Sequence, residues 1–257
     1  MKKSARKFTA NNSGQLLIVA ALAIAVLVSS TTIYVYELSR ETISSDRRAL
    51  GDFVLSLKQS TRNVIMSSLA NVSNGGPSSD LSANLNSFSQ LVAGLRQFGT
   101  MNLDFALLND SMYNSGIRLS WGTNSTGVSS AYANFTLQVH GLDEDIATAF
   151  AVNVTTTITL DGSYITLASG QKQVSLACRL NGEGKPSLAE NMTFFCEDSG
   201  NWTQVDVSNG LSIIDQGNGT YFVSFTVNVL SDTLQVSIHA YDSRNILVAT
   251  NAICSEA

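Results

Sequence analysis

The chain has 257 residues, with 15 Lys and Arg against 20 Asp and Glu and a net charge of −5. Four of the cations lie in the first seven residues, so the rest of the chain carries 11 cations against 20 anions. Such an acidic balance repels phosphate backbones and anionic lipid surfaces, which excludes nucleic acid as an expected partner. The length leaves room for one or two domains with their own cores.

The stretch from Leu16 to Tyr36 contains no charged residue, and a basic leader at residues 1–14 precedes it. About 20 mainly apolar residues span a bilayer as a helix, because a helix satisfies its own backbone hydrogen bonds. The positive-inside rule keeps the leader in the cytoplasm. The sequence therefore predicts a single-pass cell-membrane protein with extracytoplasmic C-terminal domains. Three fates of the segment remain open: a permanent anchor, a secretory signal cleaved near Ser30, and a prepilin-type helix cut on its cytoplasmic side.

Apolar residues at helical spacing continue from Glu37 to Val72, so one helix is expected to run from Gln15 to about Val72. The stretch at residues 74–79 contains two glycines and a proline, which end that helix. A second helix is expected over residues 80–98, with Ser79 or Asp80 as its N-cap. Its wide apolar face is suited to covering a sheet or the preceding helix.

The joining of a membrane-length apolar segment to an amphipathic one resembles type IV pilins, and more closely the archaeal pilin-like proteins with a class III signal peptide. Gly14 followed by Gln15 stands where a prepilin peptidase of that family cuts. The chain departs from the family pattern at Ser13, where a basic residue is usual, and at Val19, where many pilins have a glutamate. The resemblance implies self-association through the N-terminal helix, with the bundled helices forming the core of a filament.

From Leu103 onward the apolar period changes from 3.6 to 2, which predicts β-strands. Alternating apolar residues around Asn134 and Asn153 indicate two long strands joined by the acidic turn at residues 141–145. That turn lacks the ligand spacing and the glycine of a calcium loop, so a solvated turn is expected. Further alternating runs after residue 170 indicate a sandwich of short strands.

The sequence from Asp215 to Tyr221, followed by FVSFTV, resembles the turn-and-strand signature of filamin-type and invasin-type immunoglobulin-like domains. The GKP sequence at residues 184–186 stands where such domains often carry a loop. The resemblance covers about residues 163–254. It implies an immunoglobulin-like β-sandwich and, more loosely, a role in adhesion or spacing.

The three cysteines all follow residue 170. Cys178 and Cys196 lie on the inward faces of predicted strands, so a disulfide between them is the first hypothesis, and Cys254 could replace either. The alternative is that all three are reduced core residues.

Glycosylation sequons are frequent after the first 36 residues, and strand alternation predicts that at least two of them point outward. The alternative is that Asn, Ser and Thr are simply abundant on polar strand faces. The eight candidate asparagines are Asn71, Asn109, Asn124, Asn134, Asn153, Asn191, Asn201 and Asn218.

No arrangement of residues indicates catalysis or a cofactor. The two histidines, His140 and His239, fall on polar strand faces without other ligands at metal-binding spacing. The GEGK sequence at residues 182–185 lacks the pattern of a phosphate-binding loop. The chain is therefore not expected to be an enzyme, and no metal or cofactor site is predicted.

Together these observations predict an α+β protein. Its expected parts are a cytoplasmic leader (1–14), a transmembrane helix (15–36), a helical stem (37–98), a β-rich pilin-like domain (99–162) and an immunoglobulin-like β-sandwich (163–257). The expected function is that of a pilin-like cell-surface structural protein, a subunit or minor component of a type IV pilus-like filament. The alternative is a permanently membrane-anchored surface glycoprotein with adhesive or ligand-binding β-domains, whose extracellular ligand the sequence does not identify.

Overall fold

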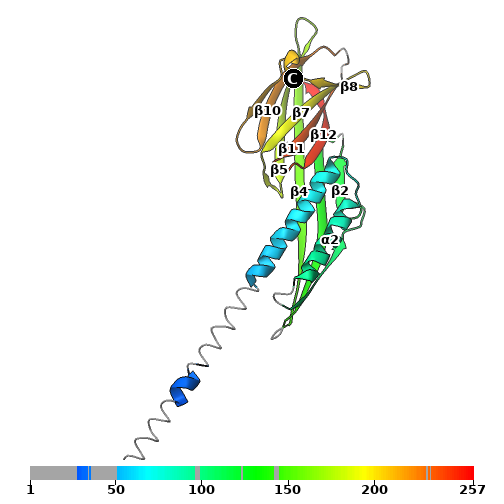
Figure 1. The fold of residues 1–257 in the computed structure, drawn as a ribbon. Helices are drawn as coiled ribbons and strands as arrows, with labels where there is room; N and C mark the ends of the chain where they lie inside the picture. The colour runs from blue at the N-terminus through cyan, green and yellow to red at the C-terminus, as the bar shows by residue number, and fades with distance from the viewer. Residues whose placement is uncertain are drawn as a thin grey trace, which may run out of the picture. The chain divides into compact units, whose positions relative to one another are not determined.

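The computed structural model describes residues 28–33, 35, 51–95, 99–122, 124–141, 145–229, 231 and 233–257. The chain divides into two units, Met1–Ser56 and Leu57–Ala257. The described residues of the first unit are helical. All the elements labelled in Figure 1 belong to the second unit.

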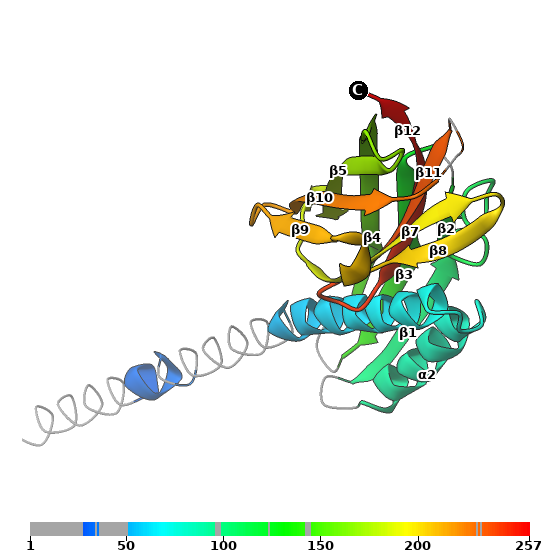
Figure 2. The same cartoon turned by 90° about the horizontal axis from the view of Figure 1, so that it is seen from above.

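Two helices cover one face of the sheet in the second unit (Figure 2). The first runs through residues 57–73, and the second is α2 (Asp80–Gly94). Ser79 precedes α2 without capping it through its side chain, and the Asp80 carboxylate instead accepts a hydrogen bond from the Asn71 amide. The apolar stripes of both helices are buried, as their helical spacing predicts. These buried residues are Leu57, Ile65, Leu69, Val72, Leu81, Leu85 and Val92.

The sheet beneath the helices is built on the antiparallel pair of β3 (Thr126–His140) and β4 (Asp145–Thr166). β1 (Thr100–Leu107) and β2 (Ile117–Trp121) both pair with the opposite edge of β3. Alternate residues of β3 point toward the helices and are buried, whereas the residues between them are mostly polar. The buried set is Ala131, Ala133, Phe135, Leu137 and Val139.

β4 is 22 residues long and extends past β3. Its second half pairs with β5 (Lys172–Gly182), and this layer continues through β10 (Thr220–Val227) to β9 (Ser212–Asp215). A second layer has the order β8 (Asn201–Val205), β7 (Ala189–Asp198), β11 (Leu234–Asp242), β12 (Leu247–Glu256). β6 (Lys185–Pro186) and the short 3-10 helix η1 (Val207–Asn209) lie in the connections.

The two layers enclose a hydrophobic core. Inward residues of β4, β5 and β10 meet those of β7, β11 and β12, as expected for two sheets packed face to face. Phe194 and Phe225 are at most 1% exposed. A parallel pairing of Ser255 with Ser163 and of Glu256 with Tyr164 joins the layers, so that the twelve described strands form one connected sheet.

This architecture corrects the predicted fold class. Of the described residues, 54% are in strands and 23% in helices, and one large β-sheet replaces the predicted α+β arrangement. The predicted boundary between residues 162 and 163 lies inside β4. A Cβ atom at Gly162 would lie 2.6 Å from the Cys254 Sγ, so this glycine marks close packing within a strand.

The predicted transmembrane helix and the single-pass, pilin-like membrane localisation are also contradicted. In the part of the chain that the structure describes, no helix is both long enough and apolar enough to cross a membrane. α2 has 15 residues, fewer than the roughly 20 required, and the helical residues 51–73 include Asp52, Lys58 and Arg62. Residues 15–27, 34 and 36 of the predicted transmembrane helix lie outside the described residues.

Candidate functional site

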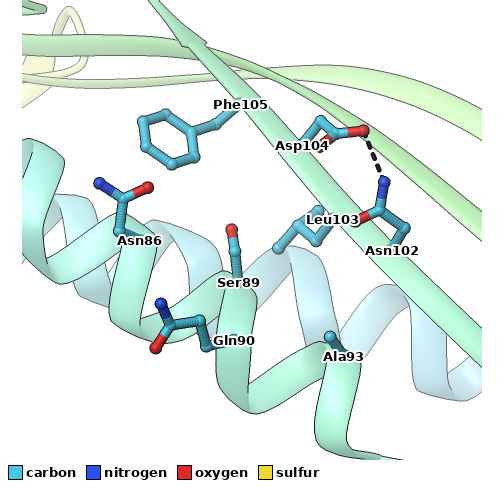
Figure 3. A pocket seen from close by; sticks show the side chains of 8 residues that line it. All are labelled: Asn86, Ser89, Gln90, Ala93, Asn102, Leu103, Asp104 and Phe105. Carbon is cyan, nitrogen blue, oxygen red and sulfur yellow. Dashed lines mark hydrogen bonds between the residues drawn. The ribbon is translucent and has the colours of Figure 1, made fainter.

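An open pocket of about 360 Å³ lies between α2 and β1 (Figure 3). The helix and the strand contribute equally to its lining. The lining residues are Asn86, Ser89, Gln90 and Ala93 of α2 and Asn102, Leu103, Asp104 and Phe105 of β1.

The helical side of the pocket follows from spacing along α2. Residue 86 is three and four positions from residues 89 and 90, and residue 93 is four and three positions from them, so the four residues form one face of the helix. The Ser89 hydroxyl is buried and has no hydrogen-bond partner among the described residues. Figure 3 shows it directed from the helix toward β1. An unpaired buried hydroxyl costs free energy, so a ligand that paired with it after a local rearrangement would relieve that cost.

The strand side of the pocket draws on both faces of β1. Alternation places Leu103 and Phe105 toward the helix and Asn102 and Asp104 on the opposite face. The Asn102 Nδ2 donates a hydrogen bond of 2.8 Å to the Asp104 Oδ2. Because four consecutive residues line the pocket, it runs along the edge of the strand and not over a single face.

This edge of β1 is open. Over the described residues, β1 pairs with β3 and with no other strand. Every second N–H and C=O of such a strand points away from its partner. Gly99 precedes β1 and has a φ of +106°. It lies so close to β3 that a Cβ atom would be 2.1 Å from the His140 carbonyl oxygen, so only glycine fits here.

The chemistry of the lining favours neutral hydrogen-bonding groups. Asp104 is the one ionisable residue among the eight, and three others carry amides that can both donate and accept. Phe105 is half-buried and adds apolar surface. The lining therefore offers several hydrogen-bonding groups, one carboxylate and one aromatic ring to a bound molecule.

A separate cluster of charges is centred on Asp242, which is completely buried. Its Oδ1 accepts hydrogen bonds from the backbone N–H groups of Arg244 and Ile246, at 2.9 and 3.0 Å. Its Oδ2 accepts from the Thr156 hydroxyl at 2.7 Å and from the Arg244 Nε at 2.9 Å. The carboxylate is therefore fully occupied by its own neighbours, as in a structural cluster.

Arg244 extends this cluster to the helical layer. It forms an ion pair of 2.5 Å with Glu183, and Glu183 forms another of 3.2 Å with Arg62 on the first helix. Burial lowers the pKa of Arg244, but the hydrogen bonds to Glu183 and Asp242 outweigh this effect and raise it above its ordinary value. The cluster joins the helix, the β5–β6 turn and the β11–β12 turn, so its role is to hold the elements together.

The two histidines make separate contacts on different strands, and the predicted processing residues fall outside the described ranges. Gly14 and Gln15 lie outside the described residues. His140 lies 3.2 Å from Asp145, and His239 packs against the Phe195 ring with 5.0 Å between ring centroids. Within the described ranges, no group of three or more His, Cys, Asp or Glu residues could hold a metal ion.

All eight sequon asparagines are exposed. Asn134 and Asn153 lie on the face of the β3–β4 sheet opposite the buried one, where the Tyr132 hydroxyl donates to the Asn134 side chain at 3.1 Å. Exposure is necessary for glycosylation, and glycosylation itself stays a prediction.

The three cysteines are buried and free, so the predicted disulfide between Cys178 and Cys196 is not formed in this structure. Burial raises the pKa of Cys178 and Cys254 to about 12 and that of Cys196 to about 11. Thiols held in the neutral form are poor nucleophiles, as expected of core residues.

Sequence reasoning missed both the pocket and the charged cluster. The pocket has one local signal, which is the polar run of Asn86, Ser89 and Gln90 bordering the apolar stripe of α2. Asp242 and Arg244 lie in a YDSRN sequence that reads as an ordinary solvated turn. Their burial depends on Thr156 and Glu183, which are distant in sequence.

Comparison with known proteins adds no family. No protein-family model matches the chain, and no curated protein matches it in sequence.

Proposed function

We propose that this chain is a non-enzymatic interaction protein that binds a partner at the α2–β1 pocket. The observation that carries the proposal is the coincidence of the pocket with an open strand edge. Such an edge offers main-chain hydrogen-bonding groups, and the pocket beside it offers side-chain groups. Protein–protein recognition commonly combines the two.

The rest of the fold acts as a rigid framework that holds the binding site in place. The sandwich core and the Asp242–Arg244 cluster fix the long strand β4, which in turn orders β3 and β1. The layer orders β4-β5-β10-β9 and β8-β7-β11-β12 are compatible with the resemblance to immunoglobulin-like domains, with β8 as an added strand. That resemblance concerns the fold alone, because immunoglobulin-like sandwiches serve many functions.

The filament hypothesis depends on residues 14–36, of which only 28–33 and 35 are described. It stays a prediction from the sequence.

Site-specific photo-crosslinking in the native host tests the proposal. A photoreactive benzoylphenylalanine replaces Ala93, which lines the pocket, and in the control replaces Ala83, an exposed residue of the same helix outside the lining. We expect a defined covalent adduct from position 93 and none from position 83. Equal adducts from both positions, or none from position 93, would contradict binding at this pocket.

A further inference from the structure

We propose that the partner contributes an extended peptide segment, which adds to the open edge of β1 as a further strand and places alternate side chains in the α2–β1 pocket. This inference rests on the proposed function and specifies its ligand. The observation behind it is that Asn102, Leu103, Asp104 and Phe105 all line the pocket although successive residues point to opposite faces.

The main chain of β1 supplies the first part of the recognition. β1 has eight residues, Thr100–Leu107, and is paired with β3 along its entire length, so its unpaired groups are fixed in direction. An incoming strand satisfies these groups without rearrangement of the sheet. The regular spacing of the groups selects an extended backbone over a helix or a compact ligand.

The face toward α2 supplies the second part. Side chains of the added strand on this face meet Ala93 and Phe105. Small or medium-sized side chains fill the pocket there, and a threonine or serine that displaced the atoms covering the Ser89 hydroxyl would pair with it. The helix sets the depth of the site, because its lining side chains face β1 across the pocket (Figure 3).

The opposite face supplies the third part. There the added strand meets the Asn102 amide and the Asp104 carboxylate, with no cation in the lining. Acidic side chains are repelled at this face, and the net charge of −5 of the whole chain acts in the same direction. The partner segment therefore alternates apolar or small residues with uncharged polar or basic ones.

Peptide selection followed by backbone methylation tests the inference on the full chain. A displayed library of random ten-residue peptides is selected against the protein, and the enriched sequences are synthesised. Each peptide is then N-methylated at one residue at a time and its affinity is measured by calorimetry. Methylation removes a backbone donor without changing the side chain, so it tests strand addition directly.

We expect N-methylation to weaken binding about tenfold or more at every second residue and much less at the residues between, because only alternate N–H groups face β1. Ala93→Trp, which fills the pocket, should abolish binding, whereas Ala83→Trp should not. Hydrogen exchange should show new protection on β1 alone. The thermal midpoints of both variants are compared first to confirm that they fold.

The other outcomes separate the two proposals. Binding that is lost with Ala93→Trp but is insensitive to N-methylation overturns strand addition and leaves the pocket as the binding site. Strand addition is also overturned if no peptide is selected and a neutral monosaccharide binds instead, provided that Ala93→Trp abolishes this binding. The pocket then remains the binding site. Peptide binding that survives Ala93→Trp overturns both proposals. The methylation series uses the unmodified protein, so it stays decisive if the tryptophan variant fails to fold.

Discussion

The two halves of β4 are stabilised in different ways. In its first half the strand pairs with β3, helices cover one face of that sheet, and the other face is exposed around Asn134 and Asn153. In its second half it pairs with β5, and the β8-β7-β11-β12 layer covers the inward face. Both halves have the same alternating pattern, so the difference lies in what packs against them. We infer that the sandwich half carries most of the stability and that the helix-covered half carries the binding surface.

The largest effect on stability is expected when a core ring is removed, and it should differ between the two halves. Phe194→Ala removes a fully buried ring from the sandwich, and we expect it to lower the free energy of unfolding by about 3–5 kcal/mol. Phe105→Ala removes a half-buried ring at the pocket and should cost less than half as much. Urea unfolding of both variants measures the difference, and equal losses would contradict the inferred distribution of stability.

The second largest loss of stability is expected at the charged cluster around Asp242. Asp242→Ala removes the completely buried carboxylate and leaves the partly buried Arg244 with Glu183 as its remaining ion-pair partner. The hydrogen-bond donors around Asp242 also lose their acceptor, so we expect the variant to cost about 3–5 kcal/mol. Asp198→Ala, at an exposed position on β7, should change stability by no more than about 0.5 kcal/mol. The same unfolding measurement tests both. If the two variants behaved alike, the cluster would not be joining the halves.

Two glycine substitutions test the backbone at the start of the edge strand β1, one at Gly99 and a control at Gly94 in α2. Gly99→Ala forces a side chain into a backbone with a φ of +106° and against the His140 carbonyl, so we expect a loss of about 1–3 kcal/mol. Gly94→Ala meets no atom within 4 Å at the end of α2 and should stabilise the protein by about 0.4–1 kcal/mol. Thermal unfolding followed by circular dichroism should therefore show shifts of opposite sign.

Because its three thiols are buried, we expect the free energy of unfolding of the protein to depend on pH in the alkaline range. Their pKa values in the folded protein, about 11 to 12, exceed the ordinary value of 9.0. Above pH 9 the unfolded chain therefore loses thiol protons that the folded chain keeps, and the free energy of unfolding falls as the pH rises toward 12. The contribution is fully present below pH 9. A variant with all three cysteines replaced by alanine should lack this part of the slope, and an unchanged slope would contradict their burial.

The smallest effect is expected at the pocket. Ser89→Ala removes a buried hydroxyl that has no partner among the described residues, so stability should stay unchanged or rise by up to about 1 kcal/mol. Ser129→Ala removes a hydroxyl that accepts from the Trp121 Nε1 and donates to the Leu247 carbonyl, and it should lower stability by about 1 kcal/mol. Losses of equal size in urea unfolding would show that Ser89 is paired.

Local patterns in the sequence identify many elements but not how they join. The alternation around Leu103, Phe135 and Val174 corresponds to β1, β3 and β5. The continuity of β4 could not be predicted, because the Asp-Gly-Ser sequence at residues 161–163 has the composition of a turn. Only the packing of Cys254 and Leu176 over Gly162 shows why a glycine is needed within the strand.

The candidate site was less predictable than the fold. Neither Ser89 nor Asp104 has a distinctive motif around it, and the pocket arises because β1 is an edge strand beside α2. Whether a strand lies at an edge depends on the pairing of the whole sheet, which local periodicity does not determine. The predictions of a membrane span and of localisation rested on the strong local signal of the apolar stretch at residues 16–36, of which the structure describes 28–33 and 35.

Native-state hydrogen exchange of the free protein tests the central claim most directly, because it compares the halves amide by amide. We expect slow exchange, close to the global free energy of unfolding, in β5, β10 and β11. In β1 we expect alternate amides to exchange rapidly, those facing β3 being protected and those on the open edge not. Uniform protection along β1 at the level of the sandwich strands would contradict both the open edge and the division of roles between the two halves.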